Sequence, residues 1–86
     1  MNKPNSQLKK IKWRCRRGMR ELDLLLGYFV EKNLNSLDSS QISALEQLLE
    51  KDDQQLESWL IKGETPDIPA LTNICQQIRN NAALYF

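Results

Sequence analysis

Hydrophobic residues recur along this chain at intervals of three and four positions, the spacing of one face of an α-helix. The strict alternation of apolar and polar residues that predicts a β-strand is not found. The spacing predicts five helices, with starts near Ser6, Met19, Asp38, Asp52 and Asp67. We therefore expect an all-α protein, a small five-helix bundle that forms a single domain over residues 1–86. Residues 1–5 and 80–86 are expected to be its most mobile segments.

The first two predicted helices differ in the width of their apolar face. The first, residues 6–17, has Ser6 as a candidate N-cap, is ended by Gly18, and carries a narrow stripe of Leu8, Ile11 and Cys15. The second, residues 19–34, has Leu24 and Tyr28 on one side and a broad stripe on the other, formed by Leu22, Leu25, Leu26, Phe29 and Val30. Because a helix that is apolar on more than one side is normally surrounded, we expect the second helix at the centre of the bundle.

The other three predicted helices are bounded by capping and helix-breaking residues. Asp38 or Ser39 can cap the third, and the adjacent pair Asp52 and Asp53 can cap the fourth, which Gly63 ends. Two prolines predict a linker between the fourth and fifth helices, and Asp67 is a candidate cap for the fifth. We expect their inward faces to be Ile42, Leu45, Leu48 and Leu49, then Leu56, Trp59 and Leu60, then Leu71, Ile74, Cys75 and Ile78.

The composition argues against catalysis. The chain has no histidine, which excludes serine or cysteine nucleophiles activated by an imidazole, histidine acid–base catalysis and histidine-containing zinc sites. The two cysteines, Cys15 and Cys75, have neither the spacing nor the number of a metal or redox motif. We expect two buried free thiols rather than a disulfide, and a cytoplasmic protein without a metal site.

The net charge of +1 conceals a strong asymmetry along the chain. Residues 1–20 contain eight basic residues and no acidic residue, whereas residues 21–86 contain four basic and eleven acidic residues. A basic block of this kind is a nucleic-acid patch, a surface for an acidic protein partner, or the solvated face of a helix. The charge alone favours the solvated face.

Trp13 makes a binding surface more plausible. On a helix, it points almost opposite to the apolar stripe, into the surrounding basic residues. Tryptophan and arginine are enriched at binding hot spots. The alternatives are that Trp13 lies back across the bundle or is covered by lysine and arginine stems.

The junction between the first two predicted helices concentrates the remaining unusual residues, Arg17 to Glu21. Gly18 can provide a left-handed or sterically unhindered turn, and Glu21 can reach back to the free amides at the start of the second helix. A glycine between basic residues also leaves bare backbone that a partner can approach closely. The physical argument favours the structural explanation of this junction.

The stretch WRCRRGMRELDLLL, with RGMRE at its centre, resembles the RGxxE signature of the small FAD assembly factors of succinate dehydrogenase and fumarate reductase, also called CptB-like antitoxins. A second stretch, LLEKDDQQLESWLIKGETP, is similar to the family's other recurrent block. The resemblance covers about residues 8–66, and we find no firm match beyond Pro66. It departs from some relatives at Lys10, where they have arginine, and at Glu57, where they have an aromatic or apolar residue.

The resemblance implies a five-helix chaperone that is not an enzyme. It implies binding to the flavoprotein subunit of succinate dehydrogenase, with that of fumarate reductase as a further candidate, and promotion of covalent FAD attachment to a histidine of that subunit. FAD then belongs to the client, and this chain binds no cofactor stably. The partner-binding residues carried over from the motif are Lys10, Trp13, Arg17, Gly18, Met19 and Glu21.

Two other functions remain as alternatives. The family's second name suggests an antitoxin that counteracts a membrane toxin, which is the weaker inference. The basic first helix suggests a small nucleic-acid-binding module, but no helix-turn-helix or aromatic RNA-binding motif accompanies it. We therefore expect a protein partner, with no nucleic acid and no membrane insertion.

Overall fold

Helices account for nearly all the regular structure of the protein. The computed structural model describes residues 5–85, and within this range it contains helices and loops but no strand. The five α-helices are α1 (Asn5–Arg14), α2 (Arg20–Asn33), α3 (Ser39–Leu49), α4 (Asp53–Leu56) and α5 (Thr72–Tyr85). Three short helical turns of other types join or extend them: η1 (Leu34–Ser36), η2 (Glu57–Ile61) and η3 (Pro69–Leu71). The prediction of an all-α five-helix protein is confirmed.

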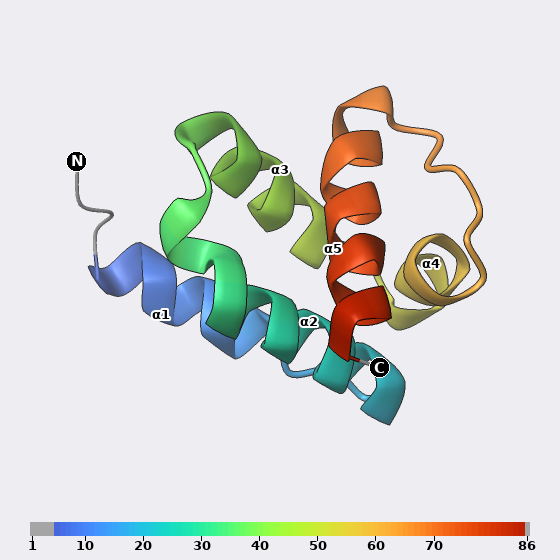
Figure 1. Cartoon of the computed structure of the whole chain (residues 1–86), viewed down its shortest axis with the longest axis horizontal. Helices are drawn as coiled ribbons and strands as arrows, with labels where there is room; N and C mark the ends of the chain where they lie inside the picture. Colours follow the sequence, from blue (N-terminus) through green and yellow to red (C-terminus); the bar gives the residue numbers. More distant parts are fainter. Residues whose placement is uncertain (1–4, 86) are drawn as a thin grey trace.

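The last helix holds the bundle together. Helix α5 packs against α2, α3 and η2, and α3 also packs against α1. The segment between η2 and η3 runs around the outside of the bundle and returns the chain to the start of α5 (Figure 1). The fold therefore brings the start of α2 and the α3–α4 turn to the same end of the molecule as the end of α1.

The core contains the residues that the helical spacing selects. All eleven residues predicted to face inward from the third, fourth and fifth helices are buried, as are Ile11, Cys15 and most of the α2 stripe. Leu8 and Leu25 are only partly buried against this core. Each fully buried leucine or isoleucine contributes roughly 1.5–3 kcal/mol of transfer free energy, so these residues are the main source of stability.

Helix α2 is not surrounded by protein, contrary to the prediction. Leu24 and Tyr28 are 42% and 39% exposed, and Gly27 between them is also exposed. The side of α2 opposite its buried stripe faces solvent, because α5 and η2 pack against the other side of the helix.

Three predicted helix boundaries are wrong. Ser6 lies inside α1, whose bounds are Asn5–Arg14. Helix α1 ends at Arg14, so Gly18 does not end it and four residues without α-helical structure precede Met19. Asp67 does not cap the last helix, because the chain enters η3 at Ile68 with a proline in the first turn. Because proline has no backbone N–H, the first turn of η3 has one amide fewer that needs a hydrogen-bond acceptor from a side-chain cap.

Two of the predicted caps are confirmed. The Asp38 carboxylate accepts a hydrogen bond from the Gln41 amide at 2.8 Å, and the Gln41 side chain accepts one from the Asp38 amide, which completes a capping box. Asp52 caps α4 by accepting from the Gln55 amide at 2.8 Å. Asp53, the other candidate cap of α4, has a different set of partners.

The fourth helix is α-helical for one turn and then widens into a π-helical turn, which the spacing did not predict. The Lys62 amide donates to the Glu57 carbonyl five residues earlier, at 2.9 Å. Trp59 and Leu60 remain buried, and Arg79 from α5 donates to the Trp59 carbonyl at 3.0 Å. Glu57 is only half-buried, 4.0 Å from Lys62 Nζ, so a charged residue at this position does not disturb the packing.

Cys15 and Cys75 are buried free thiols, as predicted. Burial raises the pKa of Cys15 to about 12 and that of Cys75 to about 11. In residues 5–85 no helix is long and apolar enough to span a bilayer.

Candidate functional site

The loop between α1 and α2 is held by one arginine. The Arg17 side chain is only 14% exposed and points into the protein. Its Nη1 donates to the carbonyl oxygens of Arg14 at 3.1 Å and Leu49 at 3.0 Å, and its Nη2 donates to that of Lys51 at 2.6 Å. Arg14 and Leu49 are the last residues of α1 and α3, so the guanidinium satisfies carbonyls that have no partner within their helices. A cation is also favoured there by both helix dipoles.

Asp53 faces Arg17 from the start of α4. Its Oδ1 accepts from Arg17 Nε at 2.8 Å, and its Oδ2 accepts from the Gly18 backbone amide at 3.0 Å. The hydrogen bond from the Arg17 side chain, followed by weaker contributions from nearby backbone amides and the Arg17 charge, lowers the pKa of the Asp53 carboxyl below its usual 3.8. The loop is also held from α2, where Asp23 Oδ1 accepts from the Arg17 amide at 2.7 Å.

Gly18 is needed for close approach and not for a left-handed turn. Gly63 is the residue with positive φ among those that the structure describes, so of the two predicted alternatives at Gly18 the left-handed turn is wrong and the sterically unhindered turn remains. A Cβ atom on Gly18 would lie 3.1 Å from Asp53 Oδ2, closer than ordinary contact. The predicted reach of Glu21 back to the helix start is also not observed, since α2 begins at Arg20 and its N-cap residue, Met19, makes no side-chain cap hydrogen bond. Glu21 is free to face outward.

The exposed face of α1 carries the predicted aromatic and basic residues. Trp13 is 74% exposed, so it neither lies back across the bundle nor is covered by its basic neighbours. The side chains around it on this helix and the following loop are also exposed, among them Lys9, Lys10, Lys12 and Arg16. An uncovered tryptophan among cations is a surface suited to a partner with acidic and apolar groups.

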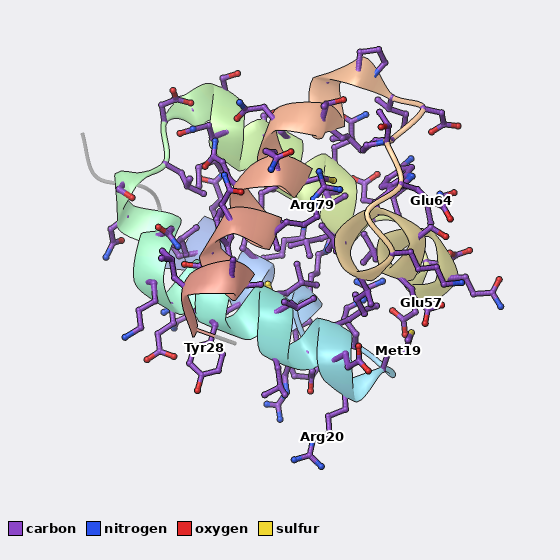
Figure 2. The ribbon with its side chains drawn as sticks, turned by 45° about the vertical axis from the view of Figure 1, so that its right-hand side comes forward. Met19, Arg20, Tyr28, Glu57, Glu64 and Arg79 are labelled. Atoms are coloured by element: carbon purple, nitrogen blue, oxygen red, sulfur yellow. The ribbon has the colours of Figure 1, made fainter. Side chains whose placement is uncertain are left out.

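The loop after α1 and the first turn of α2 carry the other predicted site residues. Gly18 and Glu21 are exposed, and Met19 is partly buried against the core. Figure 2 shows Arg20 pointing away from the body of the protein, and Tyr28 doing so further along the same helix. Glu21 also borders a shallow apolar hollow of about 290 Å³, whose other lining residues are Leu24, Leu25, Leu60 and Ile61.

Five of the six predicted site residues are therefore exposed or partly buried, and the side chain of the sixth, Arg17, is directed inward. Lys10, Trp13, Gly18 and Glu21 are exposed, and Met19 is partly so. The prediction missed Asp53 and Asp23, which hold the loop. Asp53 lies 36 residues from Arg17, and no local pattern links the two positions. Asp23 had a weak signal, since it interrupts an otherwise apolar stretch.

The chemical groups on this face can be compared with those that a metal site or a nucleophile would need. No group of three histidine, cysteine, aspartate or glutamate residues in the described part of the chain is placed to hold a metal ion. The two thiols are buried, and burial holds both of their pKa values above the ordinary range, which makes them poor nucleophiles. What the face offers is an exposed aromatic ring, several cations, an exposed carboxylate and bare backbone.

Comparison with known proteins places this chain in a family. A family model described as "Flavinator of succinate dehydrogenase" matches residues 9–82, so the match extends past Pro66, where the recognisable motifs end. The FAD assembly factor SdhE of Coxiella burnetii is 40% identical over 79 residues, covering 92% of this chain and 95% of that protein. That of Legionella pneumophila (strain Paris) is 40% identical over 76 residues, covering 88% of this chain and 95% of that protein. That of Pseudomonas aeruginosa is 34% identical over 73 residues, covering 85% of this chain and 87% of that protein. The chain belongs to the family of the flavinator of succinate dehydrogenase.

Proposed function

We propose that this protein is an assembly chaperone that binds the flavoprotein subunit of succinate dehydrogenase and promotes covalent attachment of FAD to a histidine of that subunit. Membership of the flavinator family and the naming of its relatives as FAD assembly factors support this proposal. The observation that carries it is the face around Trp13, where a ring that is 74% exposed lies among basic side chains and next to the RGxxE motif.

In this proposal the client contacts are made by Lys10, Trp13, Gly18, Met19 and Glu21. Trp13 supplies apolar contact area, and Lys10 pairs with a carboxylate of the client. A lysine forms a less directional pair than arginine, because it cannot donate two parallel hydrogen bonds. Gly18 allows the client backbone to approach closely, and the Glu21 carboxylate accepts hydrogen bonds from it.

The protein acts without taking part in the covalent chemistry. The chain contains no histidine, so the imidazole that bonds to the flavin comes from the client, as does the bound FAD. Holding two reacting groups in a productive orientation is itself a large rate effect. We therefore describe the protein as a chaperone and not as an enzyme, with FAD as the client's cofactor. We also expect it to meet its client in the cytoplasm.

The client range follows from the family resemblance. Succinate dehydrogenase is the first client, and the flavoprotein subunit of fumarate reductase is a second candidate. Binding has to be reversible, because a chaperone must leave the finished subunit. A contact area near the lower end of specific interfaces, around 1,200 Å² in total, would suit that requirement.

The test is to produce the flavoprotein subunit in cells that lack any endogenous assembly factor, with and without this chain. Covalent flavin is measured by its fluorescence in a denaturing gel. We expect a large increase with the wild-type chain and little with Gly18→Arg, whose long side chain blocks close approach. Gly27→Arg is the matched control, since Gly27 is also exposed and a Cβ there has nothing within 4 Å.

The outcomes are distinguishable. Equal flavin with and without the wild-type chain would show that the proposed function is wrong. Normal flavinylation with a folded Gly18→Arg variant would leave the function in place and remove the motif from the contact surface. Circular dichroism of both arginine variants verifies that each one is folded.

A further inference from the structure

The ends of three helices meet at one ion pair. The Arg17 guanidinium donates to the carbonyl ends of α1 and α3, and its partner Asp53 is the first residue of α4. With side chains 14% and 30% exposed, this pair is more shielded than a typical surface salt bridge. It is also geometrically determined, because four separate hydrogen bonds fix the guanidinium.

The two neighbouring aspartates at the start of α4 have separate tasks. Asp52 caps the helix through the Gln55 amide. Because the cap is already provided, both carboxylate oxygens of Asp53 are available to the α1–α2 loop, one for the Arg17 side chain and one for the Gly18 amide. The orientation of the Gly18 peptide is therefore set by a residue 35 positions away.

That orientation decides how the proposed client face is presented. Gly18 and Met19 lead directly into α2, and Glu21 is in its first turn. A loop freed from Asp53 would let the Gly18 peptide rotate and would change the direction in which α2 begins. The Arg17 side chain is directed inward, where it donates its hydrogen bonds to backbone carbonyls and to Asp53.

We propose that Arg17 and Asp53 form a latch of positioning residues, which holds segment 17–19 in the conformation that presents Gly18 and Glu21 to the client. The proposal rests on the proposed function, in which this segment contacts the flavoprotein subunit. It assigns Asp53 a functional role and gives Arg17 an indirect one: the arginine acts through the loop it holds and not by touching the client.

The test compares Asp53→Asn with Asp52→Asn. Both replace a carboxylate by an amide at adjacent positions, and asparagine caps a helix about as well as aspartate. We expect Asp53→Asn to weaken binding to the flavoprotein subunit about tenfold or more, the scale of a lost charged hydrogen bond, and Asp52→Asn to leave it unchanged. Amide hydrogen exchange, followed by NMR in the free protein, should accelerate at Arg17 and Gly18 in Asp53→Asn, with no change in α5.

A double-mutant cycle separates a latch from two independent contacts. If Arg17 acts only through the latch, Arg17→Lys combined with Asp53→Asn should bind the subunit no more weakly than the worse single variant. Additive losses would show that Arg17 touches the client and would overturn the proposal. Should Asp53→Asn fail to fold, Asp53→Glu takes its place with the same expectations, since the longer side chain displaces the carboxylate from Gly18.

The failure of this proposal differs from failure of the proposed function. If the wild-type chain does not bind the flavoprotein subunit, the function is wrong. If the wild type binds and Asp53→Asn binds equally well, or if its Gly18 amide exchanges as slowly as in the wild type, the latch is wrong while the function stands.

Discussion

At the scale of single residues, the Arg17–Asp53 pair makes stability depend on pH in a defined direction. The pKa of the Asp53 carboxyl is lower in the folded protein than its usual 3.8, chiefly because of the hydrogen bond from Arg17. A lowered folded-state pKa means that the pair stabilises the fold above the unfolded-state pKa and loses this contribution as the pH falls through the folded-state pKa.

We therefore predict that wild type is more stable than Asp53→Asn at neutral pH, and that the difference narrows below a pH of about 3.8. Urea unfolding, followed by circular dichroism at a series of pH values, measures this difference in the free energy of unfolding. Asp52→Asn should follow the wild-type curve through the acid range. A stability difference that is constant down to the lowest pH at which the protein folds would contradict the assignment.

The two thiols provide a second prediction at this scale. Burial holds the pKa of Cys15 at about 12 and that of Cys75 at about 11, so neither forms a thiolate at mildly alkaline pH while the protein is folded. We expect Ellman's reagent to modify both cysteines only after denaturant unfolds the chain. Rapid modification of either thiol in the folded protein would show that the core around α1 and α5 opens readily.

At the scale of elements, replacing a glycine by alanine should have opposite effects on stability at positions 27 and 18. Gly27 lies in the middle of α2, and an added Cβ would have nothing within 4 Å. Because glycine costs a helix interior roughly 0.5–1 kcal/mol relative to alanine, Gly27→Ala should stabilise the protein by about that amount. Gly18→Ala should destabilise it, since its Cβ would meet Asp53 Oδ2 at 3.1 Å.

Chemical denaturation of the two alanine variants checks this contrast. The flavinylation assay should be unaffected by Gly27→Ala, because the methyl group adds little to the exposed side of α2. If Gly27→Ala destabilised the protein, or if Gly18→Ala were neutral, the account of where this fold needs glycine would be incorrect.

How far the sequence predicts the structure is also clearest at this scale. The apolar spacing identifies all five helices and most of the core, because each buried face is a local, repeating pattern. It misses the π-helical turn at η2 and the loop before α2, where no periodic pattern exists. It also overstates the burial of α2, since spacing alone does not say how many neighbours a helix has. The Arg17–Asp53 pair depends on the tertiary fold, which brings together positions 36 residues apart.

The candidate site was predictable only in part. The motif and the exposed position of Trp13 follow from residues close in sequence, so five of the predicted contacts lie where a partner can reach them. The role of Arg17 does not follow from the motif, because its carbonyl partners Leu49 and Lys51 belong to a distant turn. Resemblance to a family identifies that a residue matters without showing in which direction its side chain points.

At the scale of the whole molecule, the charge asymmetry along the sequence separates α1 and the following loop, which are basic, from the rest of the protein, which is acidic. The basic first twenty residues supply α1 and the loop, and the acidic remainder supplies Asp53, which ties that loop to the bundle. The other cations of α1 are left on the surface around Trp13. The low net charge thus arises from a basic face on an otherwise acidic protein.

Trp13 should carry a large share of the binding energy. We predict that Trp13→Ala weakens binding to the flavoprotein subunit by about 2 kcal/mol or more, the threshold for a hot spot, while leaving the melting temperature unchanged. Leu84→Ala is the matched control, because Leu84 is 79% exposed on α5 and is not one of the proposed contacts. Isothermal titration gives the affinities. Equal loss in both variants, or none with Trp13→Ala, would argue against this face.

The central claim, that the end of α1, the loop and the start of α2 hold the flavoprotein subunit, is tested most directly by hydrogen–deuterium exchange of this chain with and without that subunit. The account predicts that binding slows exchange across residues 9–24, and above all in the loop from Cys15 to Met19. Slowed exchange confined to α3 and α5, with residues 9–24 unchanged, would contradict it.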